Sequence, residues 1–197
     1  MIQEQHAAFP GEAVIAAGGA LADKLGKALA IGMVRGLVGI FGDNGSGSGP
    51  VGDMAGLARE LIRQDILVLV ADAAGARNRA VGLAPADEES AGSGLAEFCD
   101  HCGIPPVLSL DGSLDGARVQ ALFAALASVL GVEIADLPAA ATLGDGGRAC
   151  DGLEKVYGAT FPAGPDPVRV AAAISQRITA KRLAKGLNDR FDGSVYS

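Results

Sequence analysis

The sequence predicts an α/β fold, namely a doubly wound, mostly parallel (Rossmann-like) sheet with helices on both faces. Short runs of consecutive apolar residues alternate with longer segments of helical periodicity. The connections between them are short, and strands that are apolar throughout are typical of a parallel sheet covered on both sides. Hydrophobic residues make up 49% of the 197 residues, which suffices for one core. We therefore expect a single domain over residues 1–187 and an irregular tail over 188–197.

The first half of the chain contains two predicted strands, each preceded by a helix. Residues 11–31 are rich in Ala and Leu at helical spacing, although their glycines weaken the helix locally. Residues 34–41 form a short apolar run that indicates a buried strand. An amphipathic helix over 52–64 leads to residues 66–71, which are apolar throughout.

A third strand is predicted after the next helix. Residues 86–102 form that helix, and residues 104–110 form the strand. Pro105 and Pro106 must lie at the very start of the strand, because proline has no N–H to donate to a sheet.

The second half continues the alternation. Residues 115–130 have apolar positions at helical spacing, and residues 137–143 and 156–161 indicate two further short strands. The last helix runs over about 166–185, with Asp166 as its N-cap and proline at its first position.

Polar residues and glycines follow the first three predicted strands. Ligands of doubly wound sheets bind outside the carboxyl ends of the strands, so these residues are candidates for one crevice. Carboxylate and hydroxyl oxygens suit Mg²⁺ or a hydrogen-bonded polar ligand. The alternative is that the Asp and Ser residues cap the helices that follow. The candidates are Gly42, Asp43, Asn44, Gly47, Gly49, Asp72, Ser109, Asp111, Ser113 and Asp115.

The glycine loop after the first strand matches a dinucleotide-binding pattern. Residues 47–52 read G-S-G-P-V-G, and Asp72 lies about 20 residues further on, where an acid would hold a ribose. Two features count against nucleotide binding. The pattern begins several residues after the strand, and Pro50 removes an N–H that a phosphate would need.

A C-x-x-C motif lies at the end of the predicted helix 86–102. Cys99 and Cys102 have no second pair, and Cys150 is the only other cysteine in the chain. The motif leads into a strand, which places it at the amino edge of the sheet, away from the crevice. It is therefore interpreted as small buried residues at a helix end, with Cys99 and Cys102 kept as metal-ligand candidates. No Ser/His/Asp hydrolase pattern is evident.

Composition excludes several classes of partner. The net charge of −7 argues against nucleic acid and anionic membranes, since both need a basic surface. No apolar run reaches the roughly 18 residues of a membrane span. The N-terminus has no signal-peptide pattern, and three cysteines suit a reducing compartment, so we expect a cytoplasmic location.

Several segments, in the right order, resemble anaerobic nickel–iron carbon monoxide dehydrogenases. Residues 35–44 (RGLVGIFGDN) resemble R-G-I-V-G-I-V-G-C-N-N of that family, and residues 57–75 resemble its L-A-K-E-L-I-x-x-D-V-L-V-V-x-T-G-C-A-A. Residues 103–118 resemble G-I-P-P-V-L-H-M-G-S-C-V-D-N-S-R. The resemblance covers about residues 12–187. It implies the C-terminal Rossmann-like domain of the family, which the hybrid-cluster proteins share.

The departures from the family pattern concern its metal ligands. In the family these strand ends supply cysteine thiolates to a nickel–iron–sulfur cluster. The corresponding positions here are Asp43, about Ala73 and Ser113, and Ser109 stands for a histidine. Because such clusters need thiolates, we expect no cofactor, no cluster and no catalysis by this chain alone. The resemblance then implies an accessory, binding or subunit protein beside a redox metalloenzyme.

Two alternatives remain open. The crevice residues bind a small ligand, a nucleotide or a hard cation such as Mg²⁺, with or without enzymatic activity. Otherwise the chain is a component of an oxidoreductase whose cluster is completed by another chain. In each case the expected partner is a protein or a second copy of the chain.

Overall fold

The computed structural model contains a five-stranded sheet in which every strand pair is parallel. It describes residues 18–41, 54–72, 90–111, 117–143, 155–162 and 164–187. The strand order is β3-β2-β1-β4-β5, which confirms the predicted doubly wound sheet. The strands are β1 (Gly36–Phe41), β2 (Ile66–Asp72), β3 (Val107–Asp111), β4 (Ala139–Leu143) and β5 (Thr160–Pro162).

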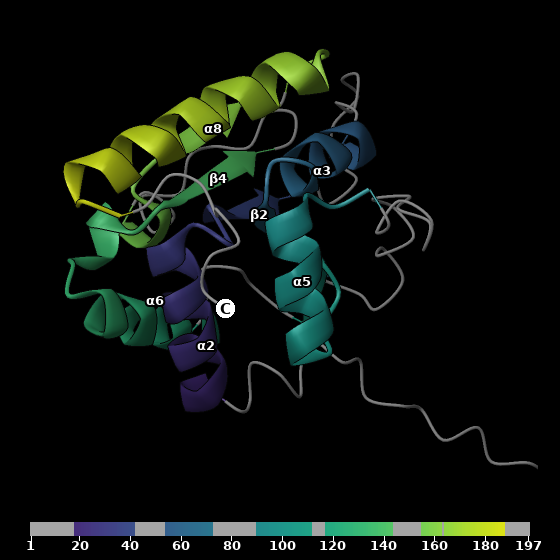
Figure 1. The fold of residues 1–197 in the computed structure, drawn as a ribbon. Coiled ribbons are helices and arrows are strands. Elements are labelled where there is room, and N and C mark those ends of the chain that lie inside the picture. Colours follow the sequence, from purple (N-terminus) through teal and green to yellow (C-terminus); the bar gives the residue numbers. More distant parts are fainter. Residues whose placement is uncertain are drawn as a thin grey trace, which may run out of the picture.

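Helices cover both faces of the sheet, as the sequence predicted. Helices α3 (Met54–Ile62) and α8 (Pro167–Ala184) pack together on one face, and α2 (Gly18–Ile31) and α6 (Ala117–Leu130) pack together on the other. Figure 1 shows the two pairs on opposite sides of the strands. The Asp166 carboxylate caps α8 by accepting a hydrogen bond from the Arg169 N–H at 3.1 Å, as predicted.

Helix α5 (Ser93–Cys102) lies across the amino edge of the sheet. Its first turn is bonded to Asp65, the residue before β2, and its last residue is followed by the short segment that enters β3. The sequence predicted this helix to begin at residue 86. Residues 90–92 are not helical, and residues 86–89 lie outside the described residues.

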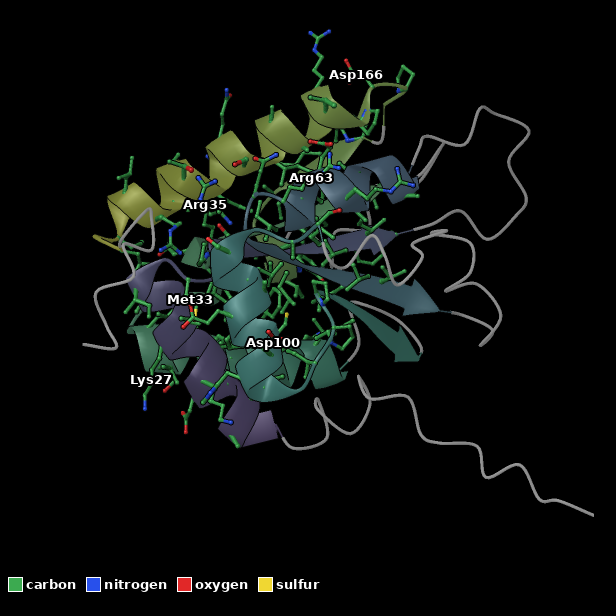
Figure 2. All side chains as sticks on the ribbon, turned by 45° about the vertical axis from the view of Figure 1, so that its right-hand side comes forward. Lys27, Met33, Arg35, Arg63, Asp100 and Asp166 are labelled. Atoms are coloured by element: carbon green, nitrogen blue, oxygen red, sulfur yellow. The ribbon has the colours of Figure 1, made fainter. Side chains whose placement is uncertain are left out.

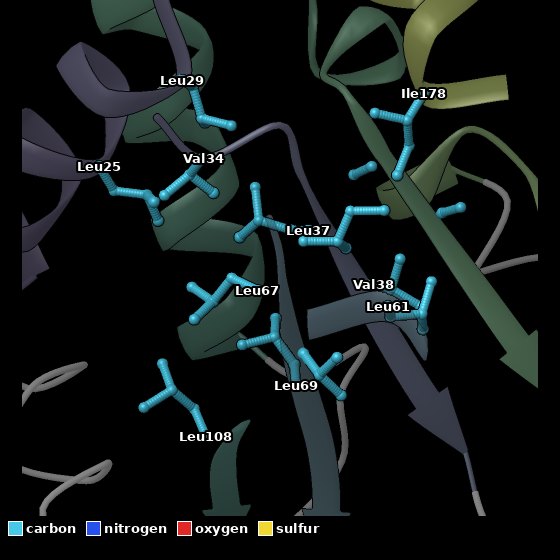
Figure 3. Close-up of a cluster of buried hydrophobic side chains, with 14 of the residues drawn as sticks. Leu25, Leu29, Val34, Leu37, Val38, Leu61, Leu67, Leu69, Leu108 and Ile178 are labelled. Atoms are coloured by element: carbon cyan, nitrogen blue, oxygen red, sulfur yellow. The ribbon is translucent and has the colours of Figure 1, made fainter. Parts of the chain in front are cut away.

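The core consists of apolar side chains from both faces of β1 and β2. Leu37 and Val38 are neighbours on β1 and point to opposite faces, yet both are completely buried, as are Leu67 and Leu69 on β2. Figure 3 shows them between leucines of α2 and α3 and Ile178 of α8. Each such side chain contributes about 1.5–3 kcal/mol by leaving water. This double coverage explains why the two strands are recognisable as continuous apolar runs.

The segment before β5 differs from its prediction. Residues 155–157 are helical rather than extended, and the strand begins only at Thr160. Gly158, with φ of +67°, follows this helical turn in a conformation that glycine adopts most readily. The turn buries Tyr157 completely, and its ring makes edge contacts with Phe41 and Phe123 at centroid distances of 5.9 and 5.0 Å.

Two basic residues near the end of α8 are buried and bind backbone carbonyls. The Lys181 ammonium donates to the carbonyls of Leu137, Ala139 and Tyr157, each at 3.0 Å. The neighbouring Arg182 guanidinium donates to the carbonyls of Leu29 at 2.8 Å and Arg35 at 3.0 Å. The end of α8 is thereby bound to the segment before β1, to the start of β4 and to the turn before β5.

Candidate functional site

The carboxyl edge of the sheet carries the candidate residues whose backbone the structure describes. Asp72 is the last residue of β2 and Asp111 the last of β3, and the two are register partners. Neighbouring strands lie about 4.8 Å apart, so two carboxylate residues end adjacent strands at this edge. Ser109 pairs with Val70, two positions further back along β3. The three residues thus lie at or near the carboxyl ends of their strands, and the crevice itself stays a prediction.

The other candidates lie outside the described residues. Gly42, Asp43, Asn44, Gly47 and Gly49 follow the end of β1 in the sequence, and Ser113 and Asp115 follow the end of β3. Their roles as ligand-binding residues therefore stay predictions.

One polar group near this edge was not predicted. Thr142 of β4 is completely buried, and its Oγ1 has no hydrogen-bond partner among the described residues. It pairs with Ile40 across the junction of β1 and β4, where the strand order reverses direction. This is the position at which doubly wound sheets bind ligands. The only sequence signal is that Thr142 is the single polar residue of the strand Ala-Ala-Ala-Thr-Leu.

The described cysteines lie at the opposite edge, as predicted. Cys99 is buried and Cys102 partly buried in the last turn of α5, and both side chains are in the reduced thiol form. Burial raises the pKa of the Cys102 thiol, and the nearby Lys24 ammonium opposes this rise. Within the described ranges there is no group of three or more His, Cys, Asp and Glu residues that could hold a metal ion. The described carboxyl edge therefore does not fit a thiolate-bound cluster by itself.

A parallel sheet with this strand order and a polar carboxyl edge defines a Rossmann-like domain. The chain belongs to the Prismane/CO dehydrogenase family, whose sequence model matches residues 5–143. It is 31% identical to carbon monoxide dehydrogenase 1 of Methanosarcina mazei, over 94% of this chain and 35% of that protein. It is 40% identical to the carbon monoxide dehydrogenase of Methanocaldococcus jannaschii, over 58% of this chain and 19% of that protein.

The solved structures agree with this assignment. The Ni-free carbon monoxide dehydrogenase from Thermococcus sp. AM4 superposes with a TM-score of 0.69 at 28% identity, covering 92% of this chain and 34% of that chain. The predicted relation to carbon monoxide dehydrogenases is thus confirmed. The chain spans about a third of the length of the first of these relatives and of this structure.

The expectation of no cofactor, with Mg²⁺ or a nucleotide as alternatives, is wrong. Nickel and iron–sulfur clusters are named in the descriptions of solved structures that resemble this chain. One solved structure is described as a Ni-free form of its enzyme, and another holds NiZn[Fe4S4] and NiNi[Fe4S4] clusters in an acetyl-CoA synthase/carbon monoxide dehydrogenase. The expectation was drawn from oxygen donors at a few strand ends, whereas those relatives are about three times as long as this chain. None of the helices that the structure describes is long and apolar enough to cross a membrane.

Proposed function

We propose that this chain is a subunit or accessory component of a carbon monoxide dehydrogenase-type oxidoreductase, and that it does not catalyse the reaction alone. The nickel–iron–sulfur cluster of that assembly takes its thiolates from another chain. The observation that carries the proposal is a match over nearly the whole chain to about a third of a carbon monoxide dehydrogenase.

The chemistry of the strand ends supports the proposal that the cluster thiolates come from another chain. The resemblance assigns metal-binding cysteines to positions where this chain has Asp43 and Ser113. Carboxylate and hydroxyl groups are hard oxygen ligands, whereas iron–sulfur clusters are held by thiolates. The described thiols, Cys99 and Cys102, belong to a helix at the amino edge of the sheet.

We further propose that the carboxyl edge faces the partner. Asp72 and Asp111 end adjacent strands there, and Asp43 follows the neighbouring strand in the sequence. Acidic residues at the ends of neighbouring strands favour a partner with a basic surface and would steer its approach.

Metal analysis separates this proposal from its competitors. The chain produced alone under anaerobic conditions should contain neither iron nor nickel in stoichiometric amounts and should not oxidise carbon monoxide. The chain captured from its native source should copurify with a cluster-containing protein. A purified single chain with a full complement of nickel, iron and sulfide would overturn the proposal.

Substitutions at the two edges test the orientation of the complex. Replacing Asp72 and Asp111 together by Asn should weaken association with the copurifying protein, because it removes two charges from the proposed interface. The matched control is Asp100→Asn, which removes a charge from the exposed face of α5 at the amino edge. Equal effects of the two changes on association would contradict the proposed interface.

A further inference from the structure

A groove of about 430 Å³ lies between α2 and α5, at the edge of the sheet opposite the carboxyl ends. Its deepest side chains are Met33 and Phe98, which are 4% and 3% exposed, and the partly buried Ile31 extends this apolar floor. Figure 2 shows Met33 between the two helices. The volume is within the range of about 300–1,000 Å³ that is typical of small-molecule sites.

Structural contacts at the start of α5 hold the groove in shape. A Cβ added at Gly94 would collide with the backbone carbonyl of Met33, so α5 and the end of α2 approach as closely as a glycine permits. The Asp65 carboxylate accepts a hydrogen bond at 2.8 Å from the backbone N–H of Leu95, the residue after Gly94. A groove built from fixed elements loses little conformational freedom when a ligand enters.

The rim of the groove has an excess of basic groups. Lys24 and Lys27 lie one turn apart on α2 and are exposed, and His101 lies across from them on α5. Among the described residues that line the groove, Glu97 is the only acidic one. This local excess of basic groups occurs in a chain whose net charge is −7.

We propose that this groove binds an organic anion, a molecule with a carboxylate or phosphate head and an apolar body. The head is bound by the ammonium groups of Lys24 and Lys27, and the body covers Ile31, Met33 and Phe98. A volume of about 430 Å³ is that of a small-molecule site, so a small molecule fits this groove better than a docked helix. The inference does not depend on the proposed function, which concerns the other edge of the sheet.

Fluorescence titration with anilinonaphthalene sulfonate, an aromatic anion, tests the site in the full chain. The probe should bind saturably, and dodecanoate or dodecyl phosphate should displace it. The more effective of these two competitors identifies the head group. The double substitution of Lys24→Glu with Lys27→Glu should weaken probe binding by roughly tenfold, because two groups that attract the anion become groups that repel it. A tenfold loss of affinity corresponds to about 1.4 kcal/mol.

The matched control is Lys155→Glu, which reverses the charge of an exposed lysine on the helical turn before β5. It should change the affinity less than about twofold, in keeping with the small effect of isolated surface charges. Thermal unfolding of each variant shows that the fold is retained. A further variant, Ile31→Ser, keeps both lysines and should also weaken binding. The proposal is overturned if the wild-type chain does not bind the probe saturably, or if Lys155→Glu weakens binding as much as the double variant. It is also overturned if an acidic amphipathic peptide displaces the probe while dodecanoate and dodecyl phosphate both fail to do so.

Discussion

The Asp65 carboxylate caps helix α5 from a position 30 residues earlier in the chain, accepting a hydrogen bond from the Leu95 N–H at 2.8 Å. The N-cap residue of this helix is Gly92, which has no side chain to do so. Asp65 itself has φ of 59°, a left-handed conformation that Asp and Asn tolerate better than most residues. Burial raises the pKa of its carboxyl, and hydrogen bonds from Leu95 and Gly94 oppose that rise.

Asp65→Ala should destabilise the fold by about 1–3 kcal/mol, because it removes a helix cap and leaves at positive φ a residue whose side chain cannot form a hydrogen bond. Asp65→Asn is the matched control, since its amide oxygen still accepts the bond and it tolerates the same backbone conformation. It should cost less than half as much. Urea denaturation measures both, and an equal loss in the two variants would show that capping is not the reason.

Lys181 lies in a site that disfavours its charge. Burial, and secondarily repulsion by Arg177, lower its pKa from 10.5 to about 8, while Asp136 acts in the opposite direction. Between these two values the unfolded chain retains a proton that the folded chain has released. The free energy of unfolding contributed by Lys181 therefore rises as the pH rises through this window, and it is constant below the folded pKa.

Comparison with Lys181→Met isolates this contribution from the other groups that titrate at alkaline pH. The difference in unfolding free energy, wild type minus variant, should increase between about pH 7 and about pH 10, by an amount on the order of 1–3 kcal/mol. Chemical denaturation at a series of pH values gives the difference directly. A difference that is constant or falls with pH would mean that the folded pKa is not lowered.

The sequence predicted those parts of the fold whose causes are local. Strand β1 and residues 66–71 of β2 form continuous apolar runs because both faces of the sheet are covered, and α8 carries its own Asp166 cap followed by proline. The start of α5 was predicted wrongly because its cap comes from Asp65, far away in the sequence. Residues 155–157 contain Val and Tyr, which favour strands, but the fold uses the turn to bury Tyr157 against Phe41 and Phe123.

The candidate site was predictable only in part. The alternation of strands and helices was enough to bring Asp72 and Asp111 to the same edge, because a parallel sheet fixes where strands end. Thr142 was missed because one threonine in a strand has no distinctive spacing. The cofactor was predicted wrongly, because the prediction used a few strand-end residues of a chain that spans only about a third of its relatives.

Gly39 shows how closely β1 approaches the aromatic cluster. A Cβ added there would lie 2.8 Å from the ring of the completely buried Tyr157. Gly39→Ala should therefore destabilise the fold by about 1–3 kcal/mol through overpacking. Gly164→Ala is the control, because its added Cβ would meet only one methyl group of Val170, at 3.3 Å. Thermal unfolding should rank the two variants in this order, and a neutral Gly39→Ala would show that the ring has room to move.

The buried hydroxyl of Thr142 gives the sharpest test of the carboxyl edge. A buried hydroxyl without a partner costs about 1–3 kcal/mol of desolvation, and valine has nearly the same shape without this group. Thr142→Val should therefore raise the free energy of unfolding of the isolated chain by about 1 kcal/mol. Thr142→Ala, which also removes the hydroxyl but leaves a cavity, should not stabilise the chain. A Thr142→Val variant that is less stable than the wild type would instead assign Thr142 a structural hydrogen bond within the chain.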